Sequence, residues 1–74
     1  MQSTLSAARA QHSRDTLEAM ARMARATASV VHVVVQREPG VVENARVMAH
    51  DAGVAISVDL MAFTARVRFD GTSA

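Results

Sequence analysis

The sequence predicts an α+β domain whose elements follow in the order helix, strand, helix, strand. Residues 28–36 are almost all β-branched and apolar, which is typical of a strand buried on both faces. The stretches before and after it, 3–26 and 40–52, repeat their apolar residues at helical spacing instead. Because two strands alone do not form a stable sheet, we expect homodimerisation to complete a small sheet that carries its helices on one face.

Length and composition indicate one domain, residues 1–74, that is short of core material. Half of the residues are hydrophobic but only 3% are aromatic, and the apolar content is mostly Ala and Val. A domain of this size buries only about 60% of its unfolded surface and is usually stabilised by disulfides, a metal or self-association. The chain has no cysteine, which leaves self-association as the expected remedy.

The first helix, 3–26, is rich in Ala, Leu, Met, Arg and Glu, which all favour helices, and it contains neither Gly nor Pro. One stripe of it is apolar and narrow, so we expect a close approach to the sheet. The strand 28–36 follows directly and ends before Pro39, which removes a donor from the sheet. The second helix, 40–52, begins at Pro39 or Gly40, and Gly53 is the expected C-cap.

The last element is predicted to be one long strand, 54–69, with a bulge near 60–61. Apolar residues alternate on one face up to Leu60 and then change phase at Met61, as a one-residue slip would cause. The alternative is two strands, but no Gly, Pro or Asn marks a turn there. The order strand, helix, strand predicts a parallel crossover, and residues 70–74 are expected to fray.

Charge and residue chemistry argue against several functions. The net charge is +1, and the pI of about 9.1 follows from the absence of groups that titrate between His and Arg, so it does not indicate nucleic-acid binding. The chain does not show the residue spacing of a metal site or of a nucleophilic triad, either among its histidines (His12, His32 and His50) or among its carboxylates. We therefore expect no enzyme activity, no catalytic residues, no cofactor and no metal.

The sequence favours a small non-enzymatic interaction or accessory protein, which acts as a homo-oligomer and binds a host or partner protein. Abundant Arg, Ala and Val have GC-rich codons and suggest a high-GC bacterium or its phage. Residues 1–13 lack the apolar core of a secretory signal, and 28–36 is too short to cross a membrane, so we expect a cytoplasmic protein without a membrane partner. The expected interface residues are Val31, His32, Val33, Val35, Phe63, Val67 and Phe69.

The alternative is a small dimeric DNA-binding regulator. Arg66 and Arg68 would form a basic face on the last strand and contact phosphates from a β-ribbon. Residues 45–62 also resemble a degenerate helix-turn-helix, because Ala49 is followed four residues later by Gly53 and then by an apolar residue. The strand-like alternation from Val54 onward favours a helix C-cap leading into a strand over this motif.

Overall fold

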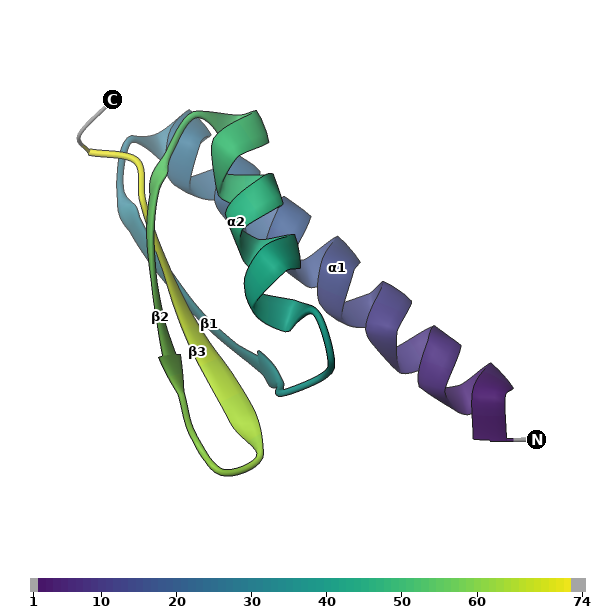
Figure 1. Ribbon diagram of the computed structural model, residues 1–74. Coiled ribbons are helices and arrows are strands. Elements are labelled where there is room, and N and C mark those ends of the chain that lie inside the picture. Colours follow the sequence, from purple (N-terminus) through teal and green to yellow (C-terminus); the bar gives the residue numbers. More distant parts are fainter. Residues whose placement is uncertain (1, 73–74) are drawn as a thin grey trace.

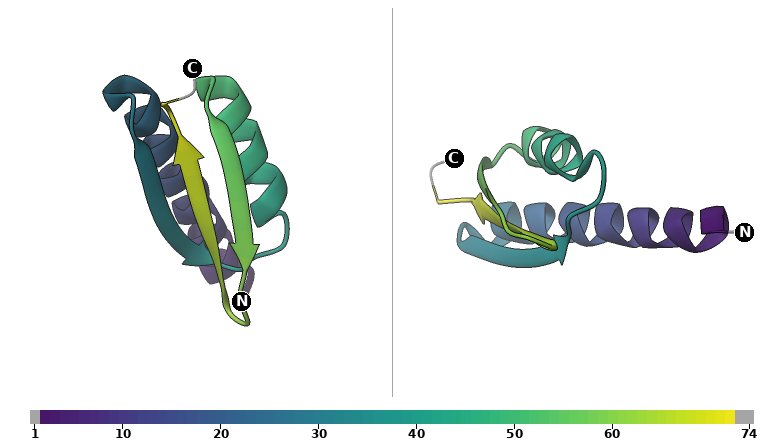
Figure 2. Two further views of the ribbon diagram at one scale, coloured as in Figure 1. Left: turned by 90° about the vertical axis from the view of Figure 1, so that its left-hand side faces the viewer. Right: turned by 60° about the horizontal axis from the view of Figure 1, so that its bottom comes forward.

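The computed structural model describes the backbone of residues 2–72 and the side chains of residues 11–72. Two helices lie against one face of a sheet, and the other face is uncovered (Figures 1 and 2), which confirms the α+β class. The elements are α1 (Gln2–Thr27), β1 (Val30–Gln36), α2 (Val41–Ala52), β2 (Ala55–Leu60) and β3 (Thr64–Asp70).

The strand order is β1-β3-β2, and both neighbours of β3 are antiparallel to it. Val67 of β3 lies between Val33 of β1 and Val58 of β2. The prediction that β1 and β2 pair as parallel neighbours is therefore wrong: they run in the same direction, but β3 is inserted between them. Each chain thus supplies three strands, not two.

The predicted single strand 54–69 is also wrong, because the chain reverses after Leu60 and forms the hairpin of β2 and β3. Leu60 pairs with Ala65, and Val58 pairs with Val67. Cross-strand partners in an antiparallel pair lie on the same face. The change of phase at Met61 therefore marks a reversal of direction and not a bulge, and it places both apolar sets on the side of the helices.

The hairpin turn is held by a residue distant in the sequence. Arg37, just after β1, donates its backbone N–H to the Phe63 carbonyl at 3.1 Å, and its Nη1 donates to the Met61 carbonyl at 2.8 Å. The Met61 N–H donates to the Thr64 carbonyl at 2.8 Å. This long-range anchor explains why the turn forms without the Gly, Pro or Asn residues that local turn chemistry favours.

The core lies between the helices and the inner face of the sheet. α1 packs on β1 and β3, α2 packs on β2 and β3, and the helices also contact each other. Phe69, Leu17 and Val67 are its largest fully buried side chains. The buried hydrophobic residues are Leu17, Ala21, Ala24, Val35, Val41, Ala45, Ala49, Ala65, Val67 and Phe69. Half of them are alanine, so the core is closely packed but small.

Both described helix C-termini close with the same motif. After α2, Gly53 has φ 73°, its N–H donates to the His50 carbonyl, and the Val54 N–H donates to the Ala49 carbonyl. This confirms Gly53 as the C-cap residue and is the hydrogen-bond pattern of a Schellman motif. After α1, Ala28 occupies the equivalent position with φ 49°. Because residues 28 and 29 close the helix, the strand begins at Val30, two residues later than predicted.

The end of β3 is fixed against α1. Gly71 is buried, and its N–H donates to the Ser29 carbonyl at 2.9 Å. A Cβ at this position would lie 2.0 Å from the Ala24 carbonyl oxygen, so the close approach requires glycine. The expected fraying from residue 70 onward is therefore wrong for the described residues 70 and 71, and residues 73–74 lie outside the description.

Candidate functional site

The uncovered face of the sheet carries the alternate residues of all three strands. On β3, Ala65, Val67 and Phe69 are buried under the helices, whereas Arg66 and Arg68 between them are exposed. The register then assigns their neighbours to the same side of the sheet. The uncovered face consists of Val30, His32, Val34, Gln36, Ala55, Ser57, Asp59, Thr64, Arg66, Arg68 and Asp70.

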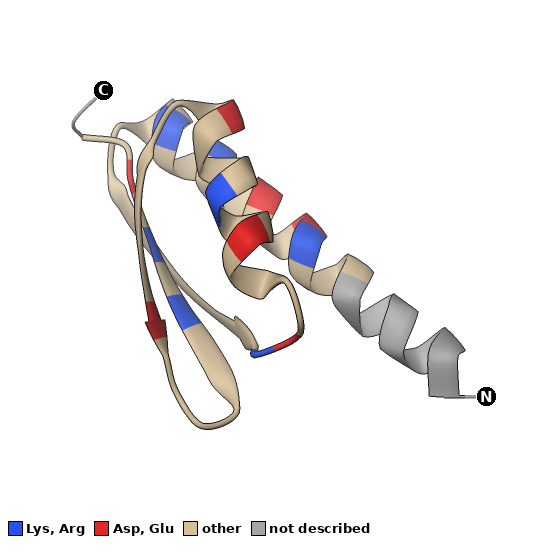
Figure 3. Cartoon of the chain, viewed as in Figure 1, with Lys and Arg blue, Asp and Glu red and all other residues tan. Residues whose placement is uncertain are grey.

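Charge on the uncovered face is mixed. Arg66 lies opposite Asp59 of β2, and Arg68 lies opposite His32 of β1. Arg68 Nη2 also lies 3.6 Å from the Asp70 carboxylate. Basic positions on β3 thus have acidic positions close by (Figure 3). The two carboxylates of this face balance its two guanidinium groups, and β1 is the strand that contributes neither a carboxylate nor a guanidinium group to it.

The outer edge of β1 has unpaired backbone groups. The Gly71 N–H donates to the Ser29 carbonyl, and the Arg37 N–H donates to the Phe63 carbonyl. Residues of odd number in β1 therefore exchange hydrogen bonds with β3, because bonded pairs alternate along an antiparallel ladder. The N–H and C=O groups of the even-numbered residues point outward in the plane of the sheet, and the Gln36 carbonyl among them accepts a hydrogen bond from the Glu38 N–H at 2.9 Å. We call this row, from Val30, His32, Val34 and Gln36, the β1 edge.

The β2 strand forms the opposite edge of the sheet, and charged side chains lie beside it. The Met61 N–H donates to the Thr64 carbonyl, so the odd-numbered residues of β2 bond to β3. The backbone groups of Ile56, Val58 and Leu60 therefore point outward. A groove of about 300 Å³ runs between this edge and α2, and it is lined by Val42, Arg46, Ile56, Ser57, Val58 and Leu60. Arg46 in the groove and Asp59 in the strand place charges at the β2 edge, and charges there deter pairing with another strand.

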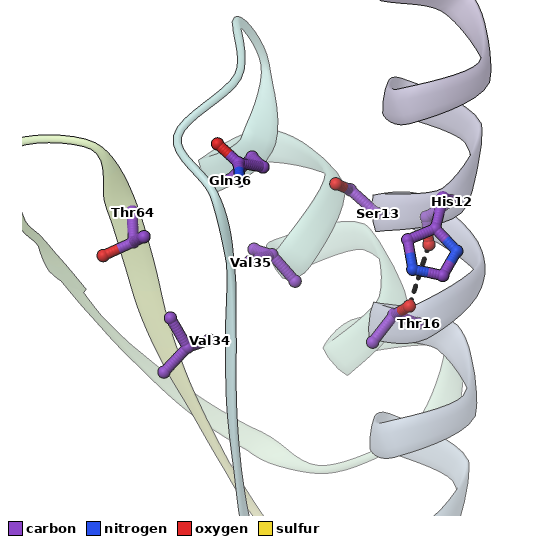
Figure 4. A pocket seen from close by; sticks show the side chains of 7 residues that line it. All are labelled: His12, Ser13, Thr16, Val34, Val35, Gln36 and Thr64. Atoms are coloured by element: carbon purple, nitrogen blue, oxygen red, sulfur yellow. Dashed lines mark hydrogen bonds between the residues drawn. The ribbon is translucent and has the colours of Figure 1, made fainter.

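A larger recess of about 570 Å³ lies between α1 and the end of β1 (Figure 4). The Thr16 hydroxyl donates to the His12 carbonyl at 2.9 Å within it. Its lining is His12, Ser13, Thr16, Val34, Val35, Gln36 and Thr64. These side chains supply hydroxyls, one imidazole and one amide, but no carboxylate that would orient the imidazole for acid–base chemistry.

The structure divides the seven expected interface residues into three groups. His32 lies on the uncovered face, and Phe63 is 83% exposed at the hairpin tip. Val31 and Val33 are half-buried on the helix side of the edge strand. The remaining three, Val35, Val67 and Phe69, belong to the core. They are removed from the candidate surface because the helices already cover them.

Sequence reasoning missed the exposed valines of β1. Val30 is 36% exposed and Val34 is 59% exposed, so the strand is not buried on both faces within one chain. In the helix layer, Met23 of α1 is 48% exposed. The hairpin tip adds Leu60 and Met61, which are about half exposed. A run without polar alternation gives no signal that one of its faces is open.

The helix-turn-helix alternative at 45–62 is wrong, because β2 occupies the place of the second helix. The structure also does not bring the suspected polar residues together. His32 and Asp59 are on the uncovered face, with β3 between their strands, whereas His50 is on α2. Its Nδ1 lies 3.7 Å from the Asp51 carboxylate, and both side chains are largely exposed.

Among the described residues, no group of three or more His, Cys, Asp or Glu side chains is placed to hold a metal ion. Neither described helix combines the length and the apolar character that crossing a membrane requires. No protein-family model, curated protein or solved structure matches the chain.

Proposed function

We propose that this protein is a small, non-enzymatic protein-interaction module that acts as a homo-oligomer. Its working surface is the β1 edge with the adjoining valines of the uncovered face. The module binds by strand addition, in which a second strand pairs with an exposed sheet edge through main-chain hydrogen bonds. A cytoplasmic accessory role in a high-GC bacterium or its phage fits this proposal and the composition.

The observation that carries the proposal is the combination of free backbone groups and exposed valines on one strand. Unpaired edges are sites of pairing with other chains unless charge, proline or a covering element protects them. β1 is seven residues long and carries no Asp, Glu, Lys or Arg. It contains no proline, and Val30 and Val34 are exposed beside the edge. These properties favour pairing at β1 over pairing at the β2 edge.

The small core supports self-association in particular. Burial of apolar area contributes about 25 cal/mol per Å², and alanine, which makes up half of the buried hydrophobic residues, contributes little area. Val31 and Val33 remain half-buried although they face the helices. A second strand beside β1 would cover both valines and lengthen the core across the seam.

The test compares proline substitutions at the two edges. Val34→Pro removes an N–H that points off the β1 edge, and Leu60→Pro does the same at the β2 edge. Neither N–H donates to β3, and both side chains are about half exposed, so the two variants are matched. We expect the unsubstituted chain and Leu60→Pro to sediment as dimers or larger species at micromolar concentration, and Val34→Pro to sediment as a monomer.

Circular dichroism should show that both proline variants keep the helix content of the unsubstituted chain. A monomeric unsubstituted chain across the micromolar range would contradict the proposal. Dissociation by Leu60→Pro with an unchanged Val34→Pro variant would contradict the choice of edge.

The second candidate is a DNA-binding regulator, and the side-by-side arrangement of Arg66 and Arg68 on the uncovered face favours it. Both guanidinium groups are exposed and lie on the central strand, where they could contact successive phosphates. The carboxylates of Asp59 and Asp70 beside them reduce the attraction, which is why we place this candidate second.

A fluorescence-anisotropy titration with duplex DNA at 50 mM and 200 mM salt distinguishes the candidates. Phosphate contacts release counterions, so binding through two or more arginines would weaken about tenfold or more between these concentrations. Binding that also disappears in Arg66→Gln would support the regulator, and absent or salt-independent binding would exclude it.

A further inference from the structure

We propose that the occupant of the β1 edge is the β1 edge of a second copy, joined antiparallel about a two-fold axis at Val33, and that protonation of His32 opens this joint. The inference rests on the proposed function and specifies the register and regulation of the same site. Two three-stranded sheets would become one continuous six-stranded sheet. Because both copies use the same surface, this interface closes on itself and does not propagate into a fibre.

The register follows from which backbone groups point outward. Hydrogen-bonded pairs across the new seam must join even-numbered residues of both strands, because the N–H and C=O groups of the odd-numbered residues already bond to β3. Centring on Val33 pairs His32 with Val34 of the second copy, and Val30 with Gln36. All seven residues of each β1 then find a partner. Centring on His32 or on Val34 would leave two residues of each strand unpaired.

The same register joins apolar groups on the helix side. The half-buried Val31 and Val33 of one copy would lie beside Val35 and Val33 of the other. The row of valines on the helix side of one sheet thereby continues into the same row of the second sheet. On the uncovered face, each Val34 lies beside an imidazole and no two charged residues stand directly opposite across the seam, so the pairing meets no like-charge contact at neutral pH.

Protonation of His32 would change this balance. Within one chain, His32 already has Arg68 directly opposite, with Arg66 and Asp70 on the diagonals. The Asp70 carboxylate is engaged with Arg68 and Thr72. Beyond β3, the same row contains Ser57, and Asp59 lies farther along β2. The described side chains of the helices pack on the other face, and the titratable His12 of α1 lines the recess beside Val34 and Gln36 at the end of β1.

Across the seam, His32 would lie directly opposite the neutral Val34, with Gln36 on one diagonal and the second His32 on the other. Arg66 of the second copy would lie one strand beyond that Val34. The two His32 residues would thus occupy diagonal positions whose backbones are about 7–8 Å apart, with arginines on both sides. Histidine side chains ordinarily titrate near pH 6.5. Acid therefore adds repulsion to the joined state that the separate chains do not have.

Cysteine cross-linking tests the register, and the absence of native cysteine makes the assay clean. Residues that face each other across a non-hydrogen-bonded pair have Cα atoms about 4.5 Å apart, which a disulfide can bridge. We expect Val33→Cys to form a disulfide-linked dimer under mild oxidation. Val31→Cys is the matched control, because its copy would lie four residues away along the partner strand and out of reach.

Sedimentation equilibrium at low salt tests the switch. We expect the dissociation constant of the dimer to rise about tenfold between pH 7.5 and pH 5.5, as repulsion at these separations allows. His32→Gln should remove this change, whereas His50→Gln, which alters a largely exposed residue on α2, should retain it.

The outcomes separate this inference from the proposed function. A dimer in which Val33→Cys fails to cross-link, or in which His32→Gln keeps the pH dependence, overturns the inference and leaves the homo-oligomer standing. A chain that is monomeric at both pH values and in every variant overturns both. Cross-linking of Val33→Cys alone, together with pH dependence that His32→Gln abolishes, supports the inference.

Discussion

The residue scale shows the same helix-ending motif made by two different residues. Gly53 and Ala28 both adopt positive φ angles and both close a helix with a paired set of backbone hydrogen bonds. Glycine reaches this region without steric cost, whereas alanine in it costs about 1–2 kcal/mol because its Cβ crowds the backbone. Ala28 is therefore a strained position in the link between α1 and the edge strand.

Exchanging the residues at these two caps should have opposite effects. Ala28→Gly should raise the free energy of unfolding by about 0.5–1 kcal/mol, since relief of strain exceeds the added entropy of the unfolded chain. Gly53→Ala should lower it by about 1 kcal/mol, because a Cβ there meets no neighbour and only the φ angle is unfavourable. Urea denaturation measures both changes, and two changes of the same sign would contradict the cap assignment.

The stability of the fold should depend on pH through Asp70, at the end of β3. Its carboxylate accepts hydrogen bonds from the Thr72 hydroxyl and the Thr72 N–H, and these bonds hold the pKa of Asp70 below its ordinary value, with a smaller effect from the Arg68 guanidinium. A carboxyl whose pKa is lower in the folded state stabilises the fold above its unfolded pKa. That contribution disappears as the pH falls through the lowered value.

We therefore expect part of the acid destabilisation below about pH 4 to come from Asp70. Asp70→Asn should be less stable than the unsubstituted chain at pH 6, and the difference should shrink as the pH falls toward 2. Urea midpoints at several pH values measure this, and parallel profiles for the two proteins would rule out the role of Asp70.

At the scale of elements, the hairpin of β2 and β3 depends on a contact from outside it. The two hydrogen bonds from Arg37 to the turn carbonyls connect the end of β1 to the hairpin tip. Local sequence around residues 61–63 contains no turn-favouring residue. The element therefore forms because β1 is already in place beside β3, and loss of the Arg37 side chain should loosen the tip.

Arg37→Ala should lower the free energy of unfolding by about 1 kcal/mol, the usual net value of a hydrogen bond in a folded protein. Arg66→Ala is the control, because this exposed arginine on the same sheet should change stability by less than about 0.5 kcal/mol. Equal effects of the two substitutions, measured by urea denaturation, would show that the anchor contributes nothing specific.

The helices and the first strand were predictable because their signals are local. Apolar residues recur at helical spacing in 3–26 and 40–52, and the run 28–36 is β-branched. Each of these patterns, like the glycine at 53, specifies its structure within a few residues. The reversal at residue 61 was not predictable, because its stabilising contacts come from Arg37. Only part of the site was predictable. His32 and Arg68 were identified as candidate residues, but we predicted a bulge where the chain makes a turn, and so did not predict the strand order that makes the two residues neighbours.

At the scale of the whole molecule, a long helix supports a short sheet. α1 has 26 residues and is about 39 Å long, whereas the seven residues of β1 span about 23 Å. The N-terminal part of α1 therefore extends past the sheet (Figure 1). With helices on one face only and a free strand at each side, one chain leaves apolar edge surface that a second chain can cover.

Amide hydrogen exchange of β1 at two protein concentrations tests this account most directly. The N–H groups of Val31 and Val33 point to β3 and should be protected at every concentration. Those of His32 and Val34 should exchange freely in dilute solution and become protected at high concentration, when a second β1 accepts their hydrogen bonds. Free exchange of His32 and Val34 at all concentrations would contradict the account, as would equal protection of all four amides in dilute monomer.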